Sequence, residues 1–463
     1  MGVTFSLPTV QIPGVAHYWL LNAQVPLSVL KEAVRGAVPN RDNLVLLDLE
    51  IEGGQIRQIR LATGIPPQGI PSVDLRRGQV WPCFVDIHTH LDKGHVWPRT
   101  PNPDGTFAGA RQAGQEDWVK MKQAYDGDPE QFREDLYRRF SFGLRCSYAH
   151  GSQAVRTHLV CENPQVMGAS WEVFVQLRRE WAGKLELQAV TLLSLDTFLT
   201  PAGEKLADKV AEVGGILGGV AAMGPELDRQ LDRVFALAKE RGLALDFHTD
   251  ETDDPGSLTL RHVAAAALRN DFPHQVVCGH CCSLAVQPPE VAHKTMALVR
   301  EAGIAVVSLP MCNLYLQARN PGHTPRWRGV TLLHELKALG VPVMIASDNC
   351  RDPFYGFGDH DGLEVFREAT RILHLDTPYG DWPQAITTTP ARIMGLTERG
   401  QIGVGLPADL VLFKGRGFDE LLSRPQHDRV VLRQGQAIDT ALPDYSELDD
   451  LMENVGAALS PKK

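Results

Sequence analysis

The sequence has few of the features that mark membrane, secreted or disulfide-bonded proteins. Its longest uncharged apolar stretch, Val213 to Met223, is rich in glycine and far shorter than the ~20 residues of a membrane-spanning helix. Only 8 of 463 residues are cysteines, and two of these are adjacent, which does not resemble a disulfide framework. The first ten residues lack the basic and apolar regions of a signal peptide. We therefore expect a cytoplasmic protein that does not bind membranes.

The charge of the chain argues weakly against nucleic acid as a partner. There are 46 Lys and Arg residues against 56 Asp and Glu residues, a formal net charge of −10, and no long basic run that could follow a phosphate backbone. With 43% hydrophobic and 22% charged residues, the composition is that of a globular protein. The length allows several domains, or one large barrel with an accessory domain.

Both ends of the chain are predicted to be rich in β-structure. Near the start, the apolar run Leu44–Ile51 ends in a Glu-Gly-Gly turn and a second short run follows, which predicts a hairpin. Similar runs occur at Ala408–Lys414 and Arg429–Gly435. We expect residues 1–80 and 399–440 to pair into one small composite β-sandwich domain. The tail, residues 441–463, is predicted to contain an amphipathic helix from Ser446 to Leu459, capped by Ser446.

Residues 81–398 show a different pattern, in which short apolar runs alternate with stretches of helical periodicity. One such stretch, Pro225–Arg241, places its apolar residues on one face and is followed by Gly242, a typical helix stop. Alternating strands and helices imply a parallel sheet, and eight such units imply a (β/α)₈ (TIM) barrel. An open doubly wound sheet is the alternative, but the first strand-to-helix turn has no G-x-G-x-x-G motif. The eight predicted strands are Cys83–Ile87, Gln153–Thr157, Leu187–Leu193, Gly215–Val220, Leu243–Phe247, Gln275–Cys278, Ile304–Leu309 and Val341–Ala346.

Polar side chains suited to binding a metal lie at the ends of these strands, where a barrel carries its active site. His88 and His90 end the first strand, and because they are two residues apart their side chains point the same way. His248, His280 and Asp348 end the fifth, sixth and eighth strands. Four imidazoles and a carboxylate that converge on one rim suit zinc, iron or manganese.

Two further residues near this rim are candidates for the pocket. Glu251 follows His248 by three residues, so it can reach a substrate atom beside the metal, although it belongs to an acidic stretch that otherwise is typical of a solvated loop. His158 ends the second strand and can line the pocket. The remaining histidines show no such placement.

A competing motif is Cys278-Gly279-His280-Cys281. A C-x-x-C sequence is used for thiol–disulfide exchange when it opens a helix in a small thioredoxin-like domain. Here it closes an apolar run within a much larger array. A thiol oxidoreductase therefore remains a third and less favoured hypothesis.

Taken together and in order, the motifs resemble the amidohydrolase superfamily, and within it the cytosine deaminase branch. The likeness covers about residues 40–440. The stretches that carry it are FVDIHTHLDK (84–93), VRTH (155–158), DFHTDETDD (246–254), GHCCSL (279–284), NLYLQAR (313–319), SDNCRDPFYGFG (347–358) and GQIGVGLPADLVLF (400–413).

The resemblance implies a role for each candidate residue. His88, His90, His248 and Asp348 would hold one divalent ion, zinc or iron(II), which lowers the pKa of its water. His280 would lie beside that water and, with Asp348, handle its proton. Glu251 would protonate a ring nitrogen of the substrate, and ammonia would leave. No lysine follows the fourth strand, which ends in GGVAAM, so a second, lysine-bridged metal is not expected.

The expected function is a metal-dependent hydrolytic deaminase of a small N-heterocycle, an enzyme acting on C–N bonds other than peptide bonds. Ser194 stands where cytosine deaminases carry a glutamine that contacts the pyrimidine, so a ring other than cytosine is a possible substrate. Gln317, Asn349 and Phe354 are further candidates for substrate contacts, together with His158. The alternative is a hydrolase of a cyclic amide or an N-alkylamino heterocycle. The family likeness also implies a homo-oligomer.

Overall fold

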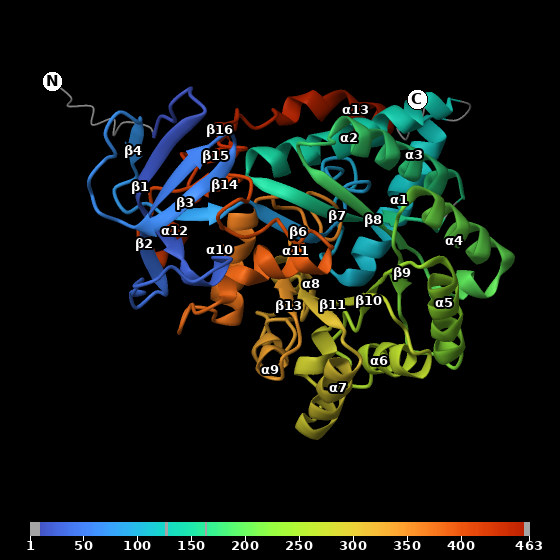
Figure 1. Ribbon diagram of the computed structural model, residues 1–463. Helices are drawn as coiled ribbons and strands as arrows, with labels where there is room; N and C mark the ends of the chain where they lie inside the picture. Colours follow the sequence, from blue (N-terminus) through green and yellow to red (C-terminus); the bar gives the residue numbers. More distant parts are fainter. Residues whose placement is uncertain (1–9, 126–127, 163, 458–463) are drawn as a thin grey trace. The chain divides into compact units, whose positions relative to one another are not determined.

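The computed structural model describes residues 10–125, 128–162 and 164–457 of the chain (Figure 1). The chain divides into two compact units. Among the described residues, the first unit comprises residues 10–85, 148–153 and 375–441, and the second comprises residues 86–147, 154–374 and 442–457. The candidate metal ligands all belong to the second unit.

Each of the eight apolar runs predicted as strands forms a strand. Several of these strands are buried along their whole length, which explains why they are continuous apolar runs rather than alternating ones. Their bounds are β6 (Phe84–Thr89), β7 (Ser152–Val160), β8 (Glu186–Leu192), β9 (Leu217–Val220), β10 (Leu245–Thr249), β11 (Val276–His280), β12 (Ala305–Ser308) and β13 (Val343–Ile345).

The eight strands form two parallel sheets. One has the order β6-β7-β8 and the other the order β13-β12-β11-β10-β9. Isolated parallel bridges connect them at both edges. Val190 pairs with Ile216 and Ser194 with Val220 between the β8 and β9 segments, and Thr89 pairs with Asp348 between the β6 and β13 segments.

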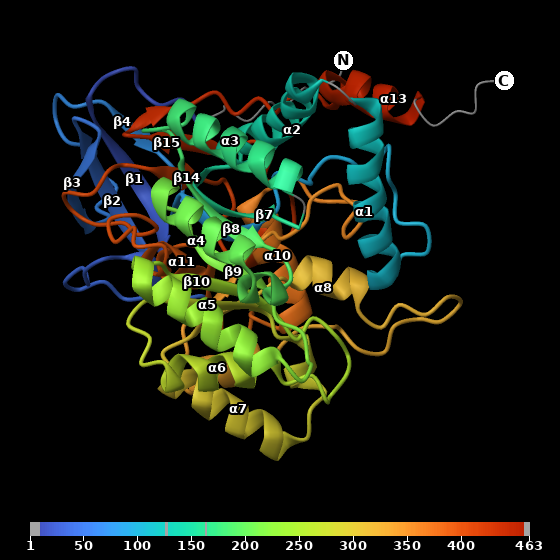
Figure 2. The same cartoon turned by 90° about the vertical axis from the view of Figure 1, so that its right-hand side faces the viewer.

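The helices of the second unit alternate with its strands, and α4 to α7 pack successively against one another outside β8 to β11 (Figure 2). As predicted, α5 ends at Gly242, whose positive φ of 66° permits a left-handed cap. The helices are α1 (Phe107–Ala124), α2 (Pro129–Ala149), α3 (Pro164–Glu180), α4 (Pro201–Val213), α5 (Leu227–Arg241), α6 (Thr259–Arg269), α7 (Pro289–Glu301), α8 (Pro310–Leu316), α9 (Leu333–Ala338) and α10 (Gly362–Leu373), with the short 3₁₀ turns η2 (Leu195–Leu199) and η3 (Cys282–Ala285).

The C-terminal helical segment begins earlier than predicted. It consists of η5 (Tyr445–Leu448) and α13 (Asp449–Ala457), and the last two residues of the predicted helix lie outside the described residues. Asp444, not Ser446, caps the segment, because the Asp444 side chain accepts from the Ser446 backbone N–H within a capping box completed by Glu447. Within the second unit, Arg138 of α2 contacts Asp450 at 2.6 Å, which holds this segment along α2.

The first unit combines strands from distant parts of the sequence. Its two sheets have the orders β3-β2-β1-β4 and β16-β15-β14-β5, and β14 pairs antiparallel with β5. The predicted hairpin is present as β2 and β3. Its elements are β1 (His17–Pro26), η1 (Leu27–Val29), β2 (Leu44–Glu52), β3 (Gln55–Leu61), β4 (Ser72–Asp74), β5 (Val80–Pro82), η4 (Trp382–Ile386), α11 (Thr388–Ile393), β14 (Leu410–Leu412), α12 (Phe418–Leu422), β15 (Val430–Arg433) and β16 (Gln436–Ala437).

One buried apolar cluster joins the early and late segments of this unit. Tyr18, Leu47 and Val80 from the early segment pack with Leu410 and Leu432 from the late one, and all five side chains are fully buried. At about 25 cal/mol per Å² of apolar surface removed from water, such side chains stabilise the pairing of the two chain ends.

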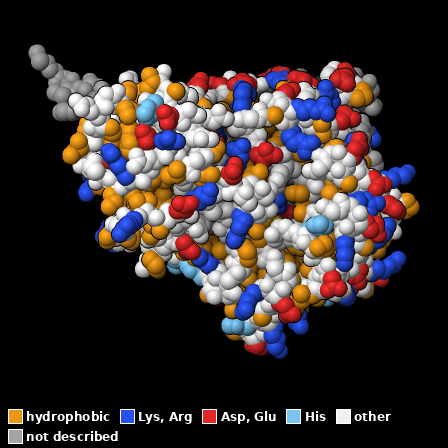
Figure 3. Space-filling view, in the orientation of Figure 1, with side chains coloured by type: hydrophobic (Ala, Val, Ile, Leu, Met, Phe, Trp, Pro, Cys, Tyr) orange, Lys and Arg blue, Asp and Glu red, His pale blue; other side chains and the backbone are white. Residues whose placement is uncertain are grey.

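Within the described part of the chain, no helix is long and apolar enough to cross a bilayer. On the face shown in Figure 3, acidic and basic side chains are interspersed among polar and apolar ones.

Candidate active site and metal centre

Five buried side chains from four strand ends meet in the second unit. The ring centroid of His88 lies 4.6 Å from that of His248 and 5.4 Å from those of His90 and His280. An Asp348 carboxylate oxygen lies 3.1 Å from Nε2 of His90 and 3.7 Å from Nε2 of His88. The five residues are at most 7% exposed. The predicted convergence is therefore present in the structure.

The donor atoms of this cluster suit a divalent cation. In the described structure, both ring nitrogens of His88 and both carboxylate oxygens of Asp348 are buried without a hydrogen-bond partner, which buried polar atoms rarely tolerate. Burial and neighbouring imidazoles lower the pKa of His88 and His248 well below the usual value. Burial lowers the pKa of His90 to about 4. The imidazoles are therefore neutral at physiological pH, which is the form that binds metal.

The backbone of Asp348 is hydrogen-bonded to two residues of β6. Its N–H donates to the His88 carbonyl at 2.8 Å, and the Thr89 hydroxyl donates to the Asp348 carbonyl at 2.9 Å. Asp348 has a φ of 65°, and His280 a φ of 68°. Such left-handed conformations are costly for residues other than glycine and tend to persist where the surroundings enforce them, often at functional sites.

His158 lies within the same cluster rather than at a separate pocket wall. Its ring centroid is 3.9 Å from that of His88 and 4.8 Å from that of His248, and nitrogen atoms of these three residues lie within 4.8 Å of one another. Beside it, Arg156 donates to Asp246 at 2.9 Å. Burial raises the pKa of Asp246 to about 7, although Arg156 opposes the shift.

Glu251 also lies at this site, as part of a small hydrogen-bonded group. One of its carboxylate oxygens is 3.3 Å from Nδ1 of His280 and accepts from Asn313 Nδ2 at 3.3 Å. Asn313 Nδ2 is 3.0 Å from the same His280 nitrogen. Because an amide nitrogen can only donate, His280 accepts at Nδ1 and the neutral ring carries its proton on Nε2. Burial, together with the charge of Asp348, raises the pKa of Glu251 well above its usual value.

The other predicted substrate residues have different surroundings. Gln317 is buried and donates to the Glu251 carbonyl at 3.3 Å. Asn349 is buried, and its side-chain oxygen has no partner among the described residues. Phe354 lies 4.1 Å from the ammonium group of Lys93. Ser194 follows β8 and is exposed.

Sequence reasoning assigned no role to Asn313 or Lys93. Asn313 lies in the middle of the short helix α8 and is completely buried, and Lys93 follows β6 in the loop after the first two proposed ligands. Both lie inside motifs that carry the family resemblance, NLYLQAR and HTHLDK. Their position in those motifs was the available signal, whereas their contacts depend on the fold.

The C-x-x-C thiols have the wrong environment for redox chemistry. Cys278 and Cys281 are buried and free, and burial raises the pKa of both. Exchange requires an accessible thiolate.

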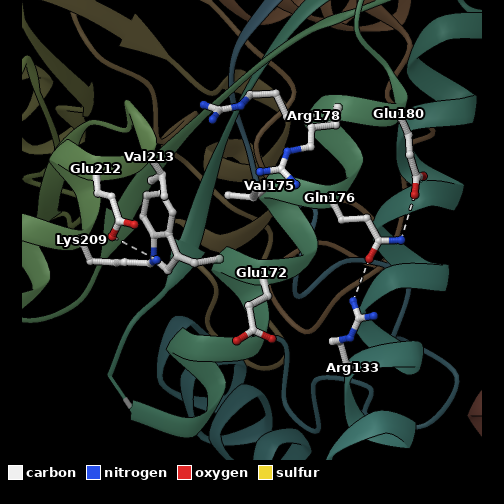
Figure 4. Close-up of a pocket in the computed structure, with 11 residues that line it drawn as sticks. Arg133, Glu172, Val175, Gln176, Arg178, Glu180, Lys209, Glu212 and Val213 are labelled. Carbon is white, nitrogen blue, oxygen red and sulfur yellow. Dashed lines mark hydrogen bonds and ion pairs between the residues drawn. The ribbon is translucent and has the colours of Figure 1, made fainter.

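A surface groove lies away from this site. It has a volume of about 730 Å³ and is formed by side chains of α2, α3 and α4, with Arg133 donating to Gln176 at its edge (Figure 4). None of the predicted site residues lines it. The lining residues are Arg133, Trp171, Glu172, Val175, Gln176, Arg178, Arg179, Glu180, Lys209, Glu212 and Val213.

Comparison with known proteins identifies the family. Residues 153–438 match the amidohydrolase family Amidohydro_3. The chain is also 50% identical, over 441 residues, to a pterin deaminase from Rhizobium rhizogenes (strain K84), which covers 95% of this chain and 98% of that protein. The chain belongs to the amidohydrolase family. This amidohydrolase is a hydrolase of C–N bonds other than peptide bonds, as predicted.

A further relative and one solved structure are also similar to this chain. The amidohydrolase is 26% identical to the N-isopropylammelide isopropyl amidohydrolase of Pseudomonas sp. (strain ADP), over 79% of this chain and 86% of that one. Its fold matches the crystal structure of 5-methylcytosine deaminase from Klebsiella pneumoniae with a TM-score of 0.75, at 24% identity, over 92% of this chain and 98% of that one. The predicted function is confirmed at the level of a hydrolytic deaminase of a small N-heterocycle.

Proposed function

We propose that this amidohydrolase is a metal-dependent deaminase whose substrate is a pterin, a two-ring heterocycle that carries an exocyclic amino group. The observation that carries the proposal is the 50% identity to a pterin deaminase along nearly the whole of both chains. Ser194 supports it, because a serine after β8 is shorter than glutamine and leaves more space beside the rim for a second ring.

The residues of the site have the chemistry that this reaction needs. Water adds to the ring carbon that bears the amino group, the C–N bond breaks, and ammonia leaves with a proton. Burial and the charge of Asp348 raise the pKa of Glu251 and so favour its protonated form; as an acid, Glu251 donates its proton to the adjacent ring nitrogen and makes that carbon electrophilic. Asn313 Nδ2 contacts both Glu251 and His280, which positions the two side chains beside each other and leaves the proton of His280 on Nε2.

We assign one divalent ion, zinc or iron(II), to His88, His90, His248 and Asp348, with His158 packed against them. The support is a set of imidazole nitrogens and carboxylate oxygens that are buried without a hydrogen-bond partner in the part of the chain that the structure describes. Such an ion supplies a water of lowered pKa as the nucleophile. Asp348, 3.1 Å from His90, is placed to accept a proton during the reaction.

We also propose that the eight parallel strands close into a (β/α)₈ barrel. The bridges at both edges of the two sheets support this closure. The barrel would occupy residues 81–398, the composite β-sandwich residues 1–80 with 399–440, and the helical tail residues 441–463. A cytoplasmic location and a homo-oligomeric state stay predictions from the sequence.

The test is ammonia release by purified, metal-replete protein from a panel of pterin, cytosine and 5-methylcytosine. We expect pterin to have the highest kcat/KM, at least 100-fold above cytosine. Turnover of cytosine without turnover of pterin would refute the proposed substrate.

A second candidate is removal of an N-alkylamino group from a triazine ring, which the 26% identity to the isopropylammelide hydrolase favours. N-isopropylammelide in the same panel, with isopropylamine as the measured product, separates the two reactions. Release of isopropylamine at a higher kcat/KM than ammonia from pterin would establish the second candidate instead.

A further inference from the structure

A second group of metal-binding side chains is buried in the same unit as the candidate active site. His95, Cys350 and His360 each offer one nitrogen or sulfur atom, and these atoms lie within 4.8 Å of one another. The three residues are at most 2% exposed. They share no residue with the four proposed ligands of the first ion. We propose that this second cluster is a structural metal site that binds Zn²⁺.

The distances within the second cluster agree with a zinc site. Nε2 of His95 and Nε2 of His360 are 3.3 Å apart. Two nitrogens each about 2.0–2.1 Å from one ion, at a tetrahedral angle, would be separated by about 3.3 Å. A nitrogen and a thiolate sulfur would be about 3.6 Å apart by the same geometry, which is compatible with three donor atoms that all lie within 4.8 Å of one another.

The ligand types select the class of ion. Two imidazoles and a thiol suit zinc and other borderline or soft ions, whereas magnesium and calcium require oxygen ligands. When the ion binds, the Cys350 thiol releases its proton to solvent and the sulfur coordinates as thiolate. The fourth position of a tetrahedral ion would be left to water.

The backbone around the second cluster is already constrained. His95 and His360 have positive φ values of 60° and 55°, which the surroundings must enforce. Helix α2 approaches so closely at Gly143 that a Cβ there would lie 3.0 Å from His360 Nε2. The His95 N–H donates to the Cys350 carbonyl at 3.1 Å. The cluster therefore lies where the loop after β6 meets the loop after β13.

An ion at this position would support the active site. Nδ1 of His360 is 3.5 Å from the Thr89 hydroxyl, and that hydroxyl donates to the Asp348 carbonyl at 2.9 Å. Metal-bound histidines are commonly oriented by such a partner at their other nitrogen. The second ion would thus fix the loop that carries Asp348, without touching substrate.

The decisive measurement is the spectrum of the full-length protein reconstituted with Co²⁺ under reducing conditions. We expect a near-ultraviolet charge-transfer band from thiolate sulfur to Co²⁺, because the second cluster contains a cysteine and the first set of ligands has only nitrogen and oxygen. Cys350→Ser should abolish the band and lower bound metal from two ions to one per chain. Cys312→Ser, a buried free cysteine near Asp348, should keep both.

Further variants and measurements distinguish a failure of this proposal from a failure of the proposed function and from misfolding of a variant. His90→Asn should lose the first ion and keep the band. A wild-type protein that binds only one ion, the one that gives the band, would contradict the metal assignment of the proposed function and leave the second site standing. If Cys350→Ser does not fold, X-ray absorption of the zinc-loaded wild-type protein replaces it, with a sulfur neighbour expected at about 2.3 Å. A wild-type protein without the band and without a sulfur neighbour, or a band that persists in folded Cys350→Ser, would overturn the proposal and leave the two histidines as a hydrogen-bonded pair.

Discussion

Replacing Glu251 by glutamine tests the proton transfer on which deamination depends. Glutamine has nearly the same shape, and its oxygen can still accept from Asn313 Nδ2, which now lies 3.3 Å from Glu251. The variant should therefore fold and bind metal as the wild type does. What it loses is an acidic proton; in the wild type, burial and the charge of Asp348 raise the pKa of Glu251 and so favour its protonated form.

The expected loss follows from the size of general acid catalysis. A positioned acid contributes about 10²–10⁴-fold, which at 1.36 kcal/mol per tenfold is about 2.7–5.4 kcal/mol of activation free energy. We expect kcat for ammonia release from pterin to fall by that factor, with bound metal unchanged. KM should change little, because the neutral amide retains the contacts of a protonated acid.

Asp253→Asn is the matched control. Asp253 belongs to the same acidic stretch and is exposed, so the same change of acid to amide there should alter kcat by less than about twofold, as surface substitutions usually do. A folded, metal-replete Glu251→Gln protein with kcat within threefold of the wild type would refute the assigned role. An equal loss in both variants would point to the charge of the loop rather than to a single proton donor.

Three further changes test the site and the fold beneath it. Chelation of the metal, or His90→Asn, should reduce kcat/KM on the order of 100-fold or more, with zinc or iron analysis showing loss of the first ion; full activity of metal-free protein would contradict the assignment. Gly218→Ala should lower the free energy of unfolding by about 1–3 kcal/mol in urea denaturation, because its Cβ would lie only 1.8 Å from the Asp246 carbonyl oxygen. The control is Gly168→Ala on α3, where no atom lies within 4 Å of the new Cβ. This control should be neutral or stabilising by up to about 1 kcal/mol. Arg156→Met should lower the free energy of unfolding by about 3–5 kcal/mol, since it leaves Asp246 buried without its cation. An unchanged urea midpoint would show that the Arg156–Asp246 ion pair is dispensable for stability.

Much of the secondary structure could be predicted because short local sequence patterns are enough to recognise it. Each of the eight parallel strands falls on a short segment with several apolar residues, and length and flanking turns are enough to recognise a strand that is buried on both faces. The cap at Gly242 was also a local property, since glycine adopts a positive φ without strain. The C-terminal cap was not predicted correctly. Asp444 and Ser446 are both good capping residues, and only the backbone path decided between them.

The sequence by itself determined which side chains stand at the ends of which strands, and so the identity of the proposed metal ligands. That inference was possible because parallel strands deliver their ends to one edge. No comparable rule predicts which loops contact each other. Three such contacts join residues that are up to 265 positions apart. They are the contact of Asn313 with His280 and Glu251, the packing of His158 among the proposed ligands, and the cluster of His95, Cys350 and His360. Only the tertiary structure brought them together, because loop paths depend on the packing of the whole unit and not on any local pattern.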